Sequence, residues 1–191
     1  MEDNGEFILN LLTQRPGPDP AETPRPTEPQ SLTVVTSLPE MQAAANRVAA
    51  SANRLISIYT PNLEVELYDQ TEFLDIIKRF VLGRNFAKVR LLLEDASRLI
   101  RNGNRFVAMA KRLTSYIDIR LVRTRLPQRA AAYIIADDRA IMLRTDMESA
   151  DAIADFNNPA IARAHLAEFD ASWIANQPEP LFHTIPRRAA P

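Results

Sequence analysis

The chain has 191 residues and a formal net charge of −1, a length that suits one domain with an additional tail. The composition is that of an ordinary globular protein, and the absence of cysteine excludes disulfides, cysteine-ligated metals and cysteine nucleophiles. No apolar run approaches the roughly 20 residues that a membrane span requires. The acidic first residues lack the basic start of a signal peptide, so we expect a cytoplasmic protein of bacterial type.

The first 36 residues divide into a short apolar segment, 1–15, and a proline-rich stretch, 16–36. Six prolines lie between residues 16 and 29 among small and polar residues, which predicts an extended, disordered linker. The apolar cluster within residues 5–14 is too short for a stable isolated helix. Two interpretations of this cluster are open, a segment that docks on a partner and a terminus that packs loosely on its own domain.

Helices and strands alternate in the pattern that follows. Ser37, Pro39 and Glu40 have the order of a helix cap, and an alanine-rich run continues to about Ala52. Helical spacing is also found at 71–82 and, with a weak point at 102–104, up to about residue 115. Strands are predicted at 55–59, 89–93 and 117–122.

A hairpin and a closing helix complete the predicted domain. Two β-rich runs, 132–136 and 140–143, flank a turn at 137–139. The closing helix spans 159–175, and its expected buried face consists of Ile161, Leu166, Phe169, Trp173 and Ile174. The order of elements predicts an α/β domain over residues 37–178, with a mixed, mainly parallel sheet flanked by helices, followed by a tail at 179–191.

Three segments carry a resemblance to a known family. Residues 54–60 are similar to its first strand, 130–138 to its signature strand, and 164–173 to its closing helix, where a phenylalanine and a tryptophan stand four residues apart. On these segments and on the element order, residues 40 to 176 resemble one half of the phospholipase D superfamily fold. The resemblance implies a two-half catalytic site, and therefore a homodimer or pairing with another chain.

The resemblance also implies that the family's chemistry is missing. The family signature places a histidine, a lysine and an aspartate on the signature strand, followed by a Gly-Ser pair. Aligning its aspartate with Asp137 puts Ala130 at the histidine position, Ala132 at the lysine position, and Arg144 and Thr145 on the Gly-Ser pair. Alanine can neither attack phosphorus nor stabilise the charge of the transition state, so we expect a pseudoenzyme. Asp137 and Thr145 would be the remnant of the site.

Charge is unevenly distributed along the chain. Residues 98–129 hold nine basic residues and one acid, Asp118, a local charge of +8. Arginine suits phosphate through bidentate hydrogen bonds, which predicts an anion-binding surface. If residues 96–113 form one helix, four of its arginines share a face. The candidate anion-binding residues are Arg98, Arg101, Arg105, Arg112, Arg120, Arg123, Arg125 and Arg129. The alternative is a solvated face with local ion pairs.

Other candidate residues favour structural roles. Asp137 and Asp138 suit a hairpin turn better than a cation site. Tyr116 and Tyr133 could stack on a base, but tyrosines at such positions are more often buried. We expect His165 to be a surface or capping residue. The sequence predicts neither a metal nor a cofactor.

These observations lead to three hypotheses of function. The first is a non-catalytic phospholipase D-like module that binds a protein partner or an anionic ligand. The second is an enzyme of another class with a rebuilt cleft, in which Arg129, Asp137 and Thr145 would be the reactive groups. The third is a nucleic-acid-binding protein that uses the basic window at 98–129.

Overall fold

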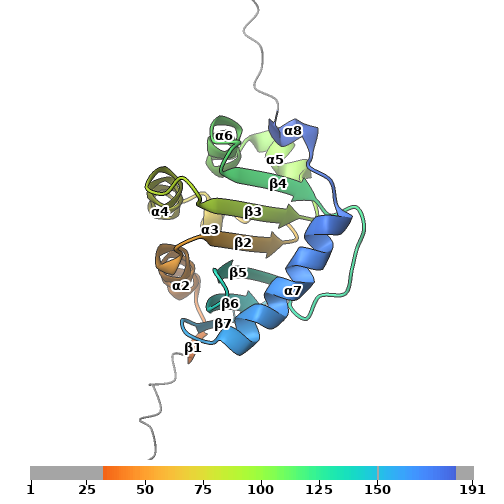
Figure 1. Ribbon diagram of the computed structural model, residues 1–191. Helices are drawn as coiled ribbons and strands as arrows, with labels where there is room; N and C mark the ends of the chain where they lie inside the picture. Colours follow the sequence, from red (N-terminus) through yellow and green to blue (C-terminus); the bar gives the residue numbers. More distant parts are fainter. Residues whose placement is uncertain (1–31, 150, 184–191) are drawn as a thin grey trace, which may run out of the picture. The chain divides into compact units, whose positions relative to one another are not determined.

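The computed structural model describes residues 32–149 and 151–183, and these residues form a seven-stranded sheet flanked by helices (Figure 1). The order across the sheet is β1-β7-β6-β5-β2-β3-β4. The strands are β1 (Leu32–Val35), β2 (Leu55–Thr60), β3 (Lys88–Leu93), β4 (Ile117–Leu121), β5 (Ala132–Ala136), β6 (Ala140–Arg144) and β7 (Ala152–Asp155). The predicted α/β class with a mixed, helix-flanked sheet is confirmed.

The expectation of a mainly parallel sheet is wrong. Only β2–β3 and β3–β4 pair in parallel, and the other four neighbouring pairs are antiparallel. A parallel pair needs a crossover connection, which helices supply between β2 and β3 and between β3 and β4. The chain passes from β4 to β5 through loop 122–131, which holds no helix, and β5 then pairs antiparallel with β2.

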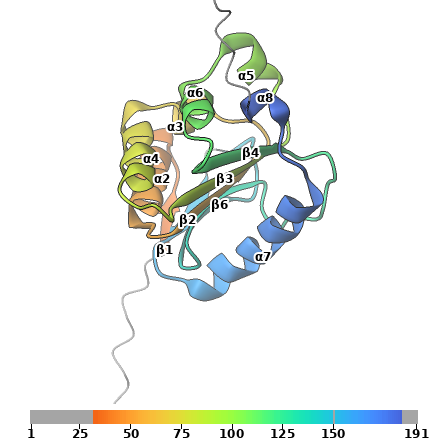
Figure 2. The same cartoon turned by 45° about the horizontal axis from the view of Figure 1, so that its top comes forward.

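The helices cover both faces of the sheet. In Figures 1 and 2, α2, α4 and α6 lie on one face, and α7 crosses the other face obliquely. The helix bounds are α2 (Leu38–Ser51), α3 (Val65–Tyr68), α4 (Thr71–Leu82), α5 (Ser97–Asn102), α6 (Arg105–Arg112), α7 (Pro159–Ala175) and α8 (Pro180–His183).

Some elements lie where the sequence pattern predicted none. Residues 32–35, at the end of the predicted linker, form β1 and pair with β7, a strand that the prediction also lacked. Helix α8 begins within the predicted tail. Four-residue elements carry too little periodicity to be recognised, and the pairing between β1 and β7 joins residues far apart in the chain. The segment 1–15, residues 16–31 of the predicted linker and residues 184–191 lie outside the described residues.

Local signals set the helix ends. The Ser37 hydroxyl accepts a hydrogen bond from the Glu40 N–H at 3.4 Å, and the Glu40 carboxylate accepts one from the Thr36 N–H at 2.9 Å, which confirms the predicted cap of α2. Gly103 has a φ of 72°, a left-handed conformation that ends α5. A single helix over 96–113 therefore does not form, and the face that its four arginines were expected to share is interrupted.

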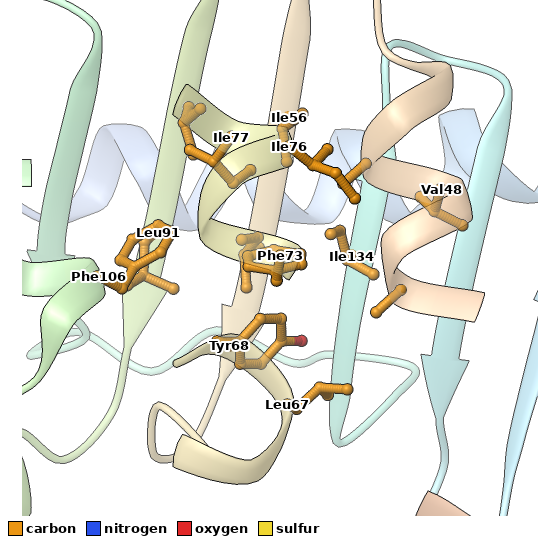
Figure 3. Close-up of a cluster of buried hydrophobic side chains, with 14 of the residues drawn as sticks. Val48, Ile56, Leu67, Tyr68, Phe73, Ile76, Ile77, Leu91, Phe106 and Ile134 are labelled. Atoms are coloured by element: carbon orange, nitrogen blue, oxygen red, sulfur yellow. The ribbon is translucent and has the colours of Figure 1, made fainter. Parts of the chain in front are cut away.

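The larger hydrophobic core lies between the sheet and helices α2, α4 and α6. Figure 3 shows Phe73 of α4 at its centre, beside Tyr68. The ring centroids of Phe73 and Tyr68 are 5.3 Å apart in an edge-to-face arrangement, and the Phe106 ring of α6 is 6.3 Å from Phe73. Phe73 is fully buried, and its ring contacts bring side chains of α3, α4 and α6 together in the core.

A smaller core lies under α7, and its composition differs from the expected buried face. Phe169 is fully buried, and Trp173 and Leu166 pack against the same cluster. Ile174, however, is 78% exposed, and His165, which we expected to be a surface or capping residue, is buried within α7. The helix crosses the sheet obliquely, so the face that it buries does not follow the hydrophobic positions alone.

Replacement of Phe73 by alanine tests the central place of this ring. Removing a fully buried aromatic side chain leaves a cavity, so we expect Phe73→Ala to lower the free energy of unfolding by about 3–5 kcal/mol. The control is Phe86→Ala, because the Phe86 side chain is 63% exposed and its loss should change stability by no more than about 0.5 kcal/mol. Urea denaturation of both variants would measure the difference, and equal midpoints would contradict this account of the core.

Candidate anion-binding site

A cavity of about 440 Å³ opens at the carboxyl ends of β2 and β3, beside loop 122–131. Ligand sites in α/β sheets commonly lie at this end of the strands, where neighbouring connections diverge. The lining residues come from four parts of the chain that follow or precede strands. They are Tyr59, Pro61, Glu94, Arg125, Leu126, Gln128, Arg129, Ala130, Ala131 and Thr145.

Asn176, just beyond the end of α7, holds the loop in place. Its side-chain oxygen accepts hydrogen bonds from the backbone N–H groups of Arg123 and Thr124 at 2.7 and 2.8 Å. Its amide nitrogen donates to the carbonyl oxygens of Thr124 and Ser172. Asn176 is 2% exposed, and a buried amide with this many partners fixes the backbone that it binds.

Two tyrosines lie beneath the cavity. The rings of Tyr59 and Tyr133 stack with centroids 5.3 Å apart. The Tyr59 hydroxyl donates to Glu94 at 2.6 Å, and the Tyr133 hydroxyl donates to Gln128 at 3.0 Å. Burial raises the pKa of Tyr59 above its usual range and the bond to Glu94 raises it further, while burial and the Glu168 carboxylate raise the pKa of Tyr133. Both tyrosines therefore stay protonated near neutral pH and act as donors.

Three arginines on loop 122–131 form what we call the rim, defined by Arg123, Arg125 and Arg129. Each pairs with one carboxylate: Arg123 with Glu179 at 2.9 Å, Arg125 with Glu94 at 2.5 Å, and Arg129 with Glu168 at 2.5 Å. The arginine side chains are 69–75% exposed, whereas their acidic partners are 17–19% exposed. Each of these largely buried carboxylates thus holds one arginine in place, and most of the arginine side chain faces solvent.

The other predicted arginines lie elsewhere, and Arg120 has a structural role. Its guanidinium lies 4.0 Å from the centroid of the Trp173 ring and donates to the carbonyl oxygens of Trp173 and Asn176. It also pairs with Asp118, and its side chain is only 18% exposed. Arg120 therefore ties the end of α7 to β4 and has few donors left for a ligand.

The arginines of α5 and α6 do not join the rim. Arg105 pairs with Asp69 at 2.9 Å and donates to the Thr71 hydroxyl, which fastens the start of α6 to the residues around α4. Arg98 and Arg101 are exposed on α5, and Arg112 ends α6. Of the eight predicted arginines, only Arg125 and Arg129 line the cavity, and Arg123 is exposed two residues before Arg125 on the same loop.

Asp137 and Thr145, the expected remnant of a catalytic site, lie at opposite ends of β5. Thr145 borders the cavity, whereas Asp137 lies in the β5–β6 turn with a φ of 55°. The Asp137 carboxylate accepts hydrogen bonds from the backbone N–H groups of Asn53, Arg54 and Leu55 at 2.8–2.9 Å. A rebuilt cleft that combines Arg129, Asp137 and Thr145 is therefore wrong, and the predicted hairpin turn is confirmed.

The sequence pattern did not indicate a functional role for several residues of the cavity. Tyr59 and Glu94 were recognisable only as residues near the ends of two predicted strands, a position at which polar groups of parallel strands converge.

Tyr133 is 1% exposed, so it is a core residue and not a platform for a base. His165 is held at its Nδ1 by the carbonyl oxygen of Ile161 at 3.0 Å. Within residues 32–149 and 151–183, no three His, Asp or Glu side chains are grouped as metal ligands, and no helix is long and apolar enough to cross a membrane.

The comparisons with known proteins agree with this architecture. Residues 37–185 match the family described as "Domain of unknown function (DUF7931)". The chain belongs to this family. No curated protein matches the chain.

Solved structures show the same fold at low sequence identity. The phospholipase D family member Nuc from Salmonella typhimurium is 18% identical, with a TM-score of 0.50 over 78% of this chain and 97% of its own. NucT from Helicobacter pylori is 10% identical, with a TM-score of 0.54 over 78% and 98%. The archaeal chromatin protein TrmBL2 is 13% identical, with a TM-score of 0.57 over 91% of this chain. The match spans 61% of TrmBL2. The predicted phospholipase D-like fold is thus confirmed.

The role of Asp137 can be tested by three substitutions. Asp137→Ala removes three charge-assisted hydrogen bonds. It also leaves alanine in the left-handed region, with no side-chain hydrogen bond to offset the steric cost of its Cβ. We therefore expect the free energy of unfolding to fall by about 2–4 kcal/mol. Asp137→Gly should lose less, because glycine accepts this φ, and Asp137→Asn should lose least, because it keeps one acceptor oxygen. Asp138→Ala is the control, and thermal unfolding would rank the four variants. Full stability of Asp137→Ala would refute the structural role.

Proposed function

We propose that this protein is a non-catalytic phospholipase D-like binding module that receives an anionic ligand at the rim and its cavity. The observation that carries the proposal is the combination of three largely exposed guanidinium groups with a cavity whose described lining contains no histidine, lysine or cysteine. By the resemblance stated above, Ala130 and Ala132 stand where the family has its histidine and lysine. Both alanines are buried.

The polar groups around the cavity support binding more than reaction. Tyr59 and Tyr133 stay protonated, and Glu94 is engaged by the Tyr59 hydroxyl and by Arg125. A carboxylate whose oxygens already accept hydrogen bonds from a hydroxyl and a guanidinium has few free lone pairs with which to meet a substrate. We therefore expect no hydrolysis of a chromogenic phosphodiester by the purified protein. A measurable rate that Glu94→Gln abolishes would instead support an enzyme of another class.

The ion pairs of the rim leave N–H donors of the exposed arginines for a ligand. Ion pairs between exposed arginines and surface carboxylates contribute only about 0–1 kcal/mol each. A phosphate group that meets two guanidinium groups forms charge-assisted, bidentate hydrogen bonds, which are stronger than single surface pairs. The rim arginines can bind such a group through their solvent-facing N–H donors while their carboxylates keep them in position.

Nucleic acid is the second candidate ligand. The rim supports it, because its three arginines are largely exposed and belong to the basic window at 98–129. The fold neighbour TrmBL2 is described as a chromatin protein with a novel mode of DNA binding. That property belongs to TrmBL2, and for this chain it motivates DNA as a probe.

Binding to labelled single-stranded and duplex DNA at low and moderate salt would test both candidates. We expect affinity to fall steeply with salt, with a slope of roughly −0.9 per phosphate contact for duplex. The triple variant Arg123→Ala, Arg125→Ala, Arg129→Ala should weaken binding at least tenfold, by about 1.4 kcal/mol or more. Inorganic pyrophosphate should compete if the rim recognises phosphate itself.

The matched control is Arg98→Ala with Arg101→Ala, which removes exposed arginines from α5 and leaves the rim intact. Circular dichroism would confirm that both variants are folded. Loss of binding in the α5 variant alone would move the site away from the rim. Absence of any binding at low salt would contradict both an anionic ligand and nucleic acid at this surface.

We also infer that the protein forms a homodimer. The family resemblance motivates this inference, because full phospholipase D sites are built from two halves. An apolar row on the outer strands supplies a surface for a second copy: Val34 is 67% exposed and lies across from Ile153, which is 40% exposed and lies across from Leu143. Exposed neighbouring aliphatic side chains of this kind favour association.

Light scattering would test the dimer. We expect twice the chain mass for the unaltered protein and the monomer mass for the double variant Val34→Lys, Ile153→Lys, in which two charges would be buried in the interface. Lysine substitution of Ile174, an exposed residue on α7, is the control for added charge. A monomer at high concentration for the unaltered protein would remove this inference.

A further inference from the structure

A larger cavity, of about 840 Å³, lies at the opposite end of the sheet from the rim. It is bounded by the residues that enter β2, the loop between α4 and β3, the β5–β6 turn, and one residue of α7. The lining residues are Asn53, Arg54, Leu55, Arg84, Phe86, Lys88, Asp137, Asp138 and Leu166.

The cationic side chains of this cavity are less compensated than those of the rim. Arg54, Arg84 and Lys88 contribute three positive charges to the lining, and Asp137 and Asp138 contribute two negative ones. The Asp137 carboxylate is taken up by three backbone N–H groups, and the Asp138 carboxylate pairs with Arg163 at 2.7 Å. Both acids are thus engaged by groups other than the three cations.

Lys88 and Arg84 have weak partners of their own. The Lys88 ammonium group donates to the carbonyl oxygen of Ser115 and lies 5.7 Å from the Tyr116 ring, which leaves further donors on the same nitrogen. The Arg84 guanidinium lies 5.9 Å from the Phe80 ring centroid. None of the three is in a salt bridge with a carboxylate of residues 32–149 or 151–183. An anion in this cavity would meet cations that form no salt bridge with the acids of the described part of the chain.

An exposed aromatic ring accompanies these charges. Gly83 ends α4, where a Cβ would come within 2.9 Å of the Arg79 carbonyl oxygen, so the chain leaves the helix in a tight turn. The turn carries Phe86 to the surface, where its side chain is 63% exposed and lines the cavity together with the partly buried Leu166. A solvent-exposed ring beside cations is a platform on which a flat aromatic ligand can stack.

We propose that this cavity binds a nucleotide, with the base on Phe86 and Leu166 and the phosphate groups on Arg54, Arg84 and Lys88. Guanidinium groups supply bidentate donors for phosphate, and the ring supplies apolar contact that a bare phosphate would not use. Asn53 at the edge of the cavity offers an amide that can donate to and accept from a base. The same chemistry is presented by a free nucleotide and by a nucleotide within a single strand. The site does not depend on the rim, which lies at the other end of β5.

Isothermal titration calorimetry with ATP, AMP and inorganic triphosphate tests the proposal on the full chain. We expect saturable binding of ATP. Phe86→Ala should weaken ATP binding about tenfold, an effect of about 1.4 kcal/mol, while leaving triphosphate binding unchanged. Arg54→Gln with Arg84→Gln should weaken ATP and triphosphate alike. The triple rim variant should bind ATP as the unaltered protein does, which separates this site from the proposed rim function.

A labelled oligonucleotide distinguishes the two sources of the base. If a single strand displaces ATP and loses affinity in Phe86→Ala, the site takes a nucleotide within a strand, and if ATP binds and the strand does not displace it, the site takes a free nucleotide. Absence of ATP binding would overturn the proposal. Equal ATP affinity of Phe86→Ala and the unaltered protein would overturn it as well, provided that the variant has an unchanged melting temperature.

Discussion

The antiparallel pairing of β5 with β2 is the contact on which the rest of the structure depends. At this line the sheet changes from parallel strands to an antiparallel meander. Asp137 secures the pairing at one end, because its carboxylate binds three consecutive backbone N–H groups at the start of β2 across 82 to 84 residues of sequence. A charge-assisted bond to backbone donors is stronger than a neutral one. These bonds offset the conformational free energy that Asp137 loses by adopting the left-handed conformation in the turn.

The same pairing creates the two ends at which cavities open. Because β5 runs against β2, the residues before β5 lie beside the carboxyl end of β2, and the residues after it lie beside the amino end. Loop 122–131 therefore delivers Arg125, Arg129 and Ala130 to one cavity. The β5–β6 turn delivers Asp137 and Asp138 to the other. One reversal of strand direction thus determines the surroundings of both sites.

Packing against helix α7 buries some arginines and leaves others exposed. Arg90 and Arg120 lie near the Trp173 ring, at 5.4 and 4.0 Å from its centroid, and Arg90 pairs with Asp170 at 2.8 Å. These cations hold the helix to the sheet and are removed from solvent. The rim arginines, by contrast, keep largely exposed side chains although each of them pairs with a carboxylate. Residues of one type in one basic window therefore serve either packing or surface chemistry, according to what the helix covers.

Local features of the sequence predicted much of the fold. The cap at Ser37, the weak point at Asn102 and Gly103, the hairpin turn at Asp137 and the alternation of apolar residues in β4 all depend on neighbours within a few residues, so they can be recognised in the chain itself. The positions of Ala130 and Ala132 were likewise readable as sequence. Of the candidate site, however, the pattern supplied only the arginine-rich loop, Ala130 and Thr145.

Strand direction, the burial of His165 and the partners of each arginine became visible only in the tertiary structure. Charge counted along the chain could not separate Arg120, which is packed on Trp173, from Arg125, which is exposed beside Glu94. The two interpretations of the apolar cluster within residues 5–14, docking on a partner and loose packing on its own domain, stay predictions. The sequence by itself determined the local elements and the absence of cysteine, because both depend on residue identity and short spacing. The tertiary structure decided which strands run together and which charges meet, because these depend on contacts between residues that lie far apart in the chain.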